Sequence, residues 1–152
     1  MFLVTEPLAT FDDDFPVVSL PVDRITLAKR LWRGTAEDGA EFGFELSAPL
    51  RHGDTVVQGT TARYVIRQLP EPLLEISLDI APSAAAGIGW AIGNLHLELS
   101  AEASRLLAPD EPAARQLLAR LSVPFRPVSG IFRPGRFVRG NQSHELGPSH
   151  RH

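Results

Sequence analysis

The chain has 152 residues, 43% hydrophobic content, no cysteine and a formal net charge of −3. This length suffices for one large domain or two small ones, each with a modest core. The lack of cysteine excludes disulfide scaffolds, thiolate metal sites and cysteine nucleophiles. Because the chain is mildly acidic and no apolar stretch approaches the roughly 20 residues of a membrane span, we expect no nucleic-acid partner and no membrane partner. The first residues lack the features of a signal peptide, which favours a cytoplasmic protein.

The first part of the chain, residues 1–72, predicts a small all-β domain. Apolar residues alternate with polar ones over several short runs, and no helical period is visible. The runs cover residues 25–31, 41–46, 55–58 and 62–67. Turn signals separate them at Glu37-Asp38-Gly39 and at His52-Gly53-Asp54. Two prolines, Pro70 and Pro72, then suit a linker.

Residues 73–129 predict a second domain with the order β-α-β-β-α-β, which is the ferredoxin-like split motif. The expected elements are a strand over 74–80, a helix from 82 to Gly93-Asn94, short strands over 96–99 and 104–107, a helix capped by Asp110, and an edge strand over 123–128. Ala85, Ile88, Ile92 and Leu95 supply the inward face of the first helix. We interpret Trp32 and Trp90 as packing residues. The fold class is therefore α+β.

The remaining segment, residues 130–152, has no hydrophobic period and is rich in Gly, Pro, Arg, Ser and His. Such a composition offers little apolar surface to offset the entropy lost on ordering. We expect a disordered tail here.

Histidines are the main candidates for a functional site. His144, His150 and His152 form a His-x5-His-x-His pattern in the tail, and neutral imidazoles bind Ni(II), Cu(II) and Zn(II). An ordinary polar tail would look the same. A lone histidine such as His96 is usually a structural residue, but two copies can share one ion across a two-fold axis. His52 is most simply a solvated turn residue.

Other chemistries lack a pattern in this sequence. The run Asp12-Asp13-Asp14 lacks the ligand spacing of a calcium loop and is more typical of a solvated turn. No Ser-His-Asp order and no nucleophile elbow is present. A hydrolase or transferase using His96 as a base, with Glu98 or Asp110 nearby, ranks last because no nucleophile accompanies it. We therefore expect that the protein is not an enzyme.

Two stretches then resemble a known family. Residues 87–99 read as a helix ending in Gly93-Asn94-Leu95-His96 before a strand, and residues 124–132 supply a Phe- and Gly-containing exit from the last strand. Together with the β-then-βαββαβ layout and the histidine-bearing tail, they resemble the UreE family of urease accessory proteins. Leu95 departs from the arginine or other polar residue that relatives commonly place there.

The resemblance implies a homodimeric nickel chaperone that delivers Ni(II) to apo-urease. His96 would be the interface ligand from each subunit, the tail histidines His144, His150 and His152 would add ligands, and the β domain would contact urease and other accessory proteins. Zn(II) or Cu(II) would suit the same ligands. Some relatives carry further histidines just before the second helix, where this chain has Asp110 and Glu111 and offers only carboxylates. The alternative is a protein-interaction module whose histidines are incidental.

Overall fold

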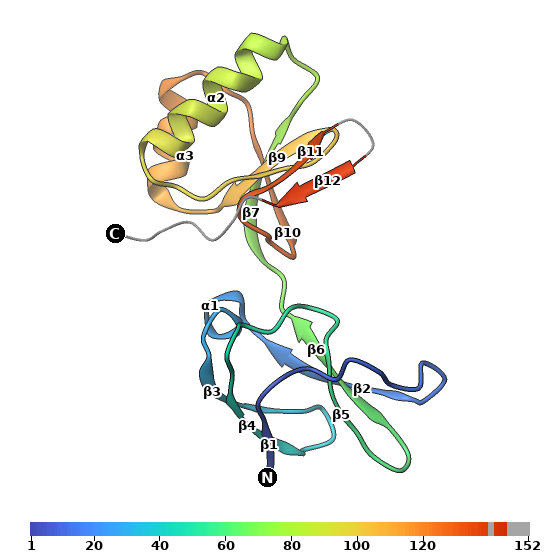
Figure 1. Cartoon of the computed structure of the whole chain (residues 1–152). Coiled ribbons are helices and arrows are strands. Elements are labelled where there is room, and N and C mark those ends of the chain that lie inside the picture. Colours follow the sequence, from blue (N-terminus) through green and yellow to red (C-terminus); the bar gives the residue numbers. More distant parts are fainter. Residues whose placement is uncertain (140–141, 146–152) are drawn as a thin grey trace. The chain divides into compact units, whose positions relative to one another are not determined.

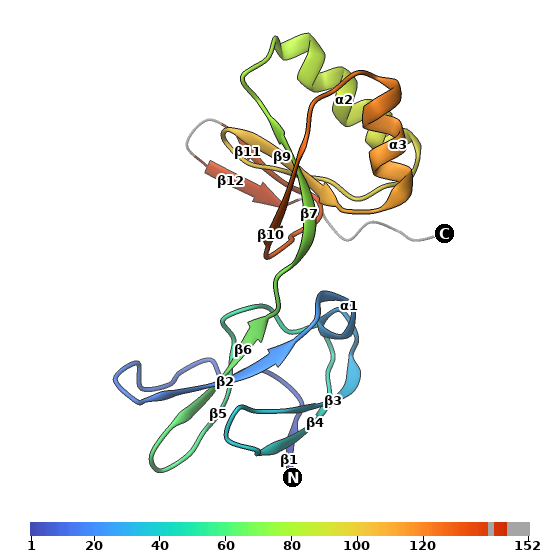
Figure 2. The same ribbon diagram turned by 180° about the vertical axis from the view of Figure 1, so that it is seen from behind.

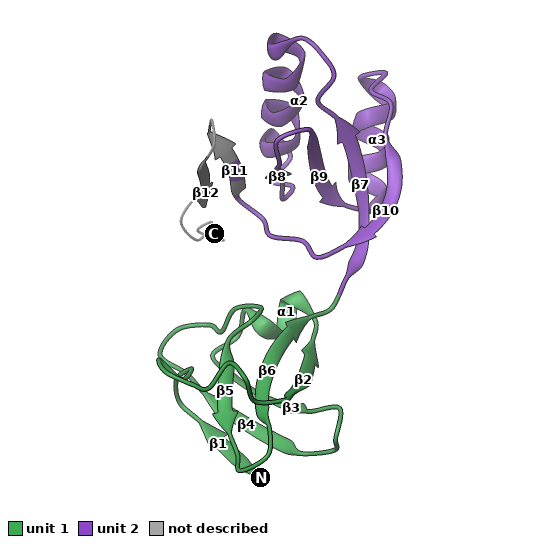
Figure 3. Cartoon of the chain, turned by 90° about the vertical axis from the view of Figure 1, so that its right-hand side faces the viewer, with its two compact units in different colours: residues 1–69 green, residues 70–152 purple. Residues whose placement is uncertain are grey.

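A computed structural model describes residues 1–139 and 142–145, with side chains left out for Arg136 and for residues 138–139 and 142–145 (Figure 1). The chain divides into two compact units, residues 1–69 and 70–152 (Figure 3). This division confirms an α+β chain with a β-rich first part. Within the described residues, no helix has both the length and the apolar character to span a membrane.

Unit 1 consists of two three-stranded sheets and one short helix. Its elements are β1 (Phe2–Val4), β2 (Val17–Val22), α1 (Arg24–Leu27), β3 (Leu31–Thr35), β4 (Glu41–Glu45), β5 (Thr55–Gln58) and β6 (Arg63–Gln68). The strand orders are β1-β4-β3 and β2-β6-β5. Inward-facing side chains of both sheets form one core that includes Leu20, Phe42, Phe44 and Ile66.

The hairpin predicted at Glu37-Asp38-Gly39 is confirmed, since β3 and β4 pair antiparallel on either side of it. Gly39 has φ +89°, a conformation that suits glycine. The strand predicted over residues 25–31 is wrong. Asp23 accepts hydrogen bonds from the Thr26 backbone N and Oγ1, both at 2.8 Å, and so caps helix α1 instead. The alternation of apolar residues misled the sequence interpretation because α1 is only one turn long.

Unit 2 contains the predicted ferredoxin-like order. Its elements are β7 (Glu71–Ser77), α2 (Pro82–Asn94), β8 (Ser100–Ala101), β9 (Arg105–Pro109), α3 (Pro112–Arg120), β10 (Arg126–Gly130), β11 (Arg136–Arg139) and β12 (Gln142–Glu145). The main sheet is antiparallel with the order β10-β7-β9-β8, so β10 lies at an edge as predicted. Helices α2 and α3 lie side by side over one face of this sheet (Figures 1 and 2).

The two faces of this sheet bury different side chains. Leu74, Ile76 and Leu106 pack under the helices, whereas Leu73 and Leu107 pack against Phe132. Phe132 is only 1% exposed. The tail expected to be disordered from residue 130 therefore begins with an ordered segment that covers part of the sheet. The apolar contact comes from the single buried ring of Phe132, and a single residue gives no periodic pattern from which this contact could be predicted.

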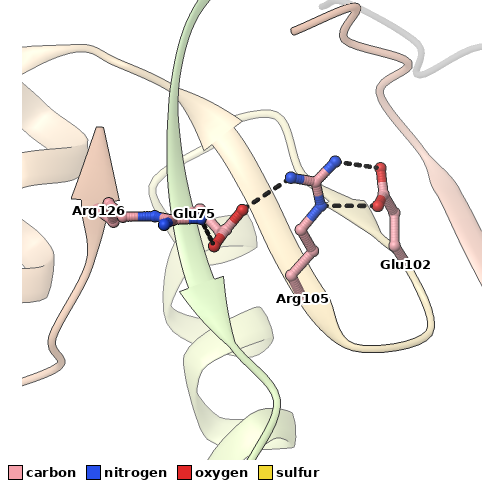
Figure 4. Close-up of polar contacts among 4 residues, drawn as sticks. All are labelled: Glu75, Glu102, Arg105 and Arg126. Atoms are coloured by element: carbon pink, nitrogen blue, oxygen red, sulfur yellow. Dashed lines mark hydrogen bonds and ion pairs between the residues drawn. The ribbon is translucent and has the colours of Figure 1, made fainter. Parts of the chain in front are cut away.

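A chain of ion pairs crosses the strands of the main sheet (Figure 4). Glu75 on β7 accepts from Arg105 on β9 at 2.7 Å and from Arg126 on β10 at 2.8 Å. Arg105 also binds Glu102 at 2.7 Å. The hydrogen bond from Arg105 lowers the pKa of the Glu75 carboxyl below its ordinary value. These alternating charges connect three neighbouring strands.

The start of α3 differs from the prediction. The N-cap residue is Glu111, whose side chain makes no capping hydrogen bond. Asp110 instead binds the guanidinium of Arg115 through both carboxylate oxygens, at 2.6 and 2.9 Å. The predicted capping role of Asp110 is thus wrong, because the N-cap is one residue later and both Asp110 carboxylate oxygens bind Arg115.

Candidate metal site at the end of helix α2

Helix α2 ends in a turn that places His96 in a left-handed conformation. His96 has φ +56°. Its backbone N donates to Gly93 O at 2.9 Å, and Leu97 N donates to Ile92 O at 3.2 Å. This pair of bonds is the Schellman motif, in which the left-handed position usually holds glycine. The predicted end of the helix at Gly93-Asn94 is confirmed, but the left-handed residue is His96.

The His96 side chain is exposed at this turn. It follows two apolar side chains that also face solvent, Trp90 at 71% and Leu95 at 44% exposure. Both had been predicted to pack, so that interpretation is wrong. The imidazole is thus accessible to a partner, as are these two apolar side chains.

Small residues surround Trp90 on the outward side of α2. Gly87 and Gly93 lie one turn to either side of it, and a Cβ at either position would have no neighbouring atom within 4 Å. The inward side is held by Ile88 and Ile92, which are buried. Together Gly87, Trp90 and Gly93 form what we call the α2 outer face. Asn94, one turn after Trp90, adds an exposed polar side chain at its end, and His96 follows in the turn after the helix.

The sequence could have revealed this face. Residues two apart on a helix are separated by about 200° around its axis. Trp90 lies two positions from both Ile88 and Ile92, so it cannot share their inward side. The predicted packing role for Trp90 did not take this phase into account.

The tail histidines are described only in part. His144 lies in β12, where its backbone is opposite Phe137 of β11. Strand β11 runs beside β8, and Gly135 N donates to Leu99 O at 2.8 Å. The segment that leads to His144 therefore contacts Leu99 and strand β8, which follow His96 in the sequence. His150 and His152 lie outside the described residues.

Two other candidate metal ligands, His52 and Asp110, bind other groups of the protein. His52 is not a free turn residue, because its Nδ1 accepts the backbone N–H of Gln68 at 2.9 Å. Asp110 is held by Arg115. Over the described ranges, no group of three or more His, Asp or Glu residues is arranged to hold a metal ion. Among these described residues, His96 therefore offers one imidazole and has no cluster of further ligands around it.

Comparison with known proteins gives the same family over both halves of the chain. A family model described as UreE urease accessory protein, C-terminal domain, matches residues 71–152. A urease accessory protein UreE from Deinococcus radiodurans is 32% identical over 77% of this chain and 79% of the relative. The chain belongs to the UreE family.

Other UreE proteins match over different lengths. One from Chelativorans sp. strain BNC1 is 28% identical, covering 100% of this chain and 99% of its own. One from Bifidobacterium longum subsp. infantis is 27% identical over 81% of this chain but only 55% of the relative. The resemblance seen in residues 87–99 is thereby confirmed, and the chain has the role of a urease accessory protein.

Proposed function

We propose that this UreE-family chain is a homodimeric nickel carrier for urease maturation, in which the His96 imidazoles of two copies bind one Ni(II). The observation that carries the proposal is the exposed His96 in the turn that follows helix α2, whose outer face presents the exposed Trp90. In this proposal the chain works in the cytoplasm and catalyses no reaction. It passes its metal to apo-urease, with unit 1 contacting urease or other urease accessory proteins.

Symmetry explains how one histidine per chain can suffice. A two-fold contact places the same residue of both copies face to face. If two α2 outer faces pack together, Trp90 becomes buried and the two helix ends meet. An exposed tryptophan among small residues supports such a contact, since Trp is enriched among residues that dominate interface energies. His96, at the edge of this face, then lies near the partner subunit's His96.

The tail supplies the remaining ligands in this proposal. His144, His150 and His152 would approach the shared ion from a segment anchored near Leu99. Imidazole ligands suit nickel but equally suit Zn(II) and Cu(II). Ligands that dissociate one at a time favour transfer, because the ion need not leave all of them at once. Acid would weaken the site, since protonated imidazole does not bind metal.

Isothermal titration with Ni(II) tests the proposal. We expect a tight site with a stoichiometry near one ion per two chains, lost in His96→Ala. His52→Ala is the matched control, because it removes an imidazole that is bonded inside unit 1 and leaves the proposed site intact. Truncation before His144 should weaken binding without abolishing it.

The alternative function, a protein-interaction module with incidental histidines, makes the opposite prediction. It expects either no heat of nickel binding or binding that His96→Ala leaves unchanged. Either result, in a protein that is still dimeric, would refute the carrier role of His96.

A further inference from the structure

The segment that follows the last strand of the main sheet, residues 131–135, is held by one side chain. It lies between β10 and β11. Of these residues, all of which the structure describes, only Phe132 is buried, with 1% exposure. Ile131 is 38% exposed, and Arg133 and Pro134 also face solvent. The segment therefore depends on a single aromatic ring for its apolar contact with the protein.

The Phe132 ring lies on the face of the main sheet that α2 and α3 do not cover. It packs with Leu73 of β7 and Leu107 of β9, and Val128 of β10 lies against this cluster. These three residues, which we call the Phe132 seat, come from three neighbouring strands, so that folding of the sheet builds the seat. An aromatic ring makes one of the largest apolar contributions of any side chain when it is buried. Phe132 thus attaches the segment to the sheet.

The seated ring fixes where the tail continues. The Gly135 N–H donates to Leu99 O at 2.8 Å, with Gly135 in a left-handed conformation of φ +77°. Strand β11 then runs beside β8, and β12 returns antiparallel to β11, which sets the His144 backbone opposite Phe137. Phe137 is two residues after Gly135, and Leu99 is three residues after His96. The tail is thereby led back to the segment that follows the His96 turn.

We propose that Phe132 is a positioning residue for the metal site, which keeps the tail histidines near enough to His96 to act as ligands. This inference rests on the nickel role proposed above. If the ring left its seat, the last attached residue would be Gly130 at the end of β10, and His144 would follow 14 residues later. With the ring seated, His144 is nine residues from the attached Gly135, and the hairpin folds this stretch back.

The length of unattached chain sets the size of the expected effect. The effective concentration of a tethered group falls roughly as the −3/2 power of the tether length. Shortening the tether from 14 residues to nine raises this concentration about twofold. A hairpin that returns to within two residues of the attachment raises it by up to about twentyfold. Release of Phe132 should therefore weaken nickel binding by an amount between these limits.

Titration with Ni(II) of four forms of the full chain tests the proposal. They are the parent, Phe132→Ala, a triple variant in which His144, His150 and His152 are alanine, and the triple variant carrying Phe132→Ala. Phe132→Ala should weaken nickel binding by about threefold to tenfold in the parent. It should have no effect in the triple variant, which has no tail imidazole left to position. Phe132→Leu, which keeps an apolar side chain in the seat, should bind nickel within about twofold of the parent.

A measurement without metal reports on the seat itself. Hydrogen exchange of the Gly135 amide should be at least about tenfold faster in Phe132→Ala, because the segment no longer holds this amide against Leu99 O. Leu118→Ala is the matched control, since Leu118 is fully buried on the helix-covered side of the sheet. It removes a comparable core side chain and should change neither the Gly135 exchange rate nor the nickel affinity by more than about twofold.

A second variant releases the tail without touching the core. Gly135→Pro removes the amide donor, and proline cannot adopt the φ of +77° found at this position. The hairpin should then detach from Leu99 while the Phe132 ring stays buried. Gly135→Pro should weaken nickel binding by about twofold or more, and again only while the tail histidines are present. This variant provides the test if Phe132→Ala does not fold.

Three outcomes would overturn the positioning role. Phe132→Ala could bind nickel like the parent although its Gly135 amide exchanges faster, or it could weaken binding equally in the triple variant. Binding could also become tighter, which would mean that the seated ring keeps the tail away from His96. Failure of the carrier role is distinguishable, because it is seen as unchanged nickel binding in His96→Ala, whatever Phe132→Ala does.

Discussion

Helices α2 and α3 of unit 2 have similar ends and different faces. Each begins at a proline after a residue whose side chain makes no capping hydrogen bond, Ala81 for α2 and Glu111 for α3. Each ends in a left-handed residue with φ +56°, His96 after α2 and Ser122 after α3. At Ser122 the bonds are again those of a Schellman motif, since Val123 N donates to Leu118 O at 2.9 Å.

Along their lengths the two helices diverge. Helix α3 has no glycine and buries Ala114, Leu117 and Leu118 against the sheet. Helix α2 has three glycines, which lower its intrinsic helix stability by about 1 kcal/mol each relative to alanine. It also leaves Trp90 in solvent. Packing within the unit accounts for α3, whereas the exposed Trp90 of α2, flanked by Gly87 and Gly93, fits the proposed contact with a second copy of the chain.

The largest expected effect is on dimer stability, and it should differ between the exposed apolar residues of the two helices. Trp90→Ala should weaken a homodimer by about 2–4 kcal/mol, because a tryptophan at the centre of an interface carries much of its energy. Leu121→Ala, at the end of α3, is the control and should leave the dimer unchanged. Sedimentation velocity over a range of concentrations measures both. A Trp90→Ala protein that dimerises like the parent would show that the α2 outer face is not the contact.

Glycine replacement sharpens the contrast in helix composition. Gly87→Ala and Gly93→Ala should each raise the free energy of unfolding by about 0.5–1 kcal/mol, because the added Cβ meets no neighbour and helix propensity improves. The measurement is urea unfolding in a Trp90→Ala background, so that dimer formation does not contribute. Ala119→Gly on the exposed side of α3 is the mirror variant and should lower stability by a similar amount. Loss of stability in the alanine variants would mean that the backbone at these glycines is strained.

Replacing the two left-handed residues with glycine tests whether the His96 side chain contributes to the stability of the fold. A non-glycine residue in this conformation costs about 1–2 kcal/mol, of which the greater flexibility of unfolded glycine cancels about half. His96→Gly and Ser122→Gly should therefore both raise the free energy of unfolding, by a similar amount of up to about 1 kcal/mol. Only His96→Gly should abolish nickel binding. If His96→Gly destabilised the protein while Ser122→Gly stabilised it, the imidazole would have a structural role within the monomer.

Much of unit 2 could be predicted from the sequence because its signals are local. Pro82 and Pro112 mark helix starts, and the apolar spacing at Leu117 and Leu118 fixes the inward side of α3. His96 was identified as a candidate from its motif, and the structure shows it exposed at the helix end. Its left-handed backbone was not predicted, because Gly93 and Asn94, three and two residues earlier, are the usual residue types in that conformation.

Features that depend on contacts between distant residues were missed. The ordered segment around Phe132 follows from its packing on Leu73 and Leu107, which are far away in the sequence. The one-turn helix α1 was missed for a different, local reason, since it rests on the cap from Asp23 to Thr26 and is too short to show a helical period. His52 was interpreted as a solvated residue because its acceptor role requires the Gln68 amide, 16 residues later. Periodicity and composition contain none of this information.

The smallest expected effect concerns the starts of the two helices. Arg115 lowers the pKa of the Asp110 carboxyl through their hydrogen bonds, while α2 begins without such a pair among the described residues. A lowered folded-state pKa stabilises the protein fully above the ordinary value of 3.8, and this stabilisation is lost as the pH falls below it. Asp110→Asn should therefore be slightly less stable than the parent near neutral pH, with the gap closing in strong acid. Urea unfolding midpoints of the two proteins across this pH range measure the gap. A gap that persists at the acid end would mean that the asparagine disturbs the start of α3 by its geometry, not through the lost charge.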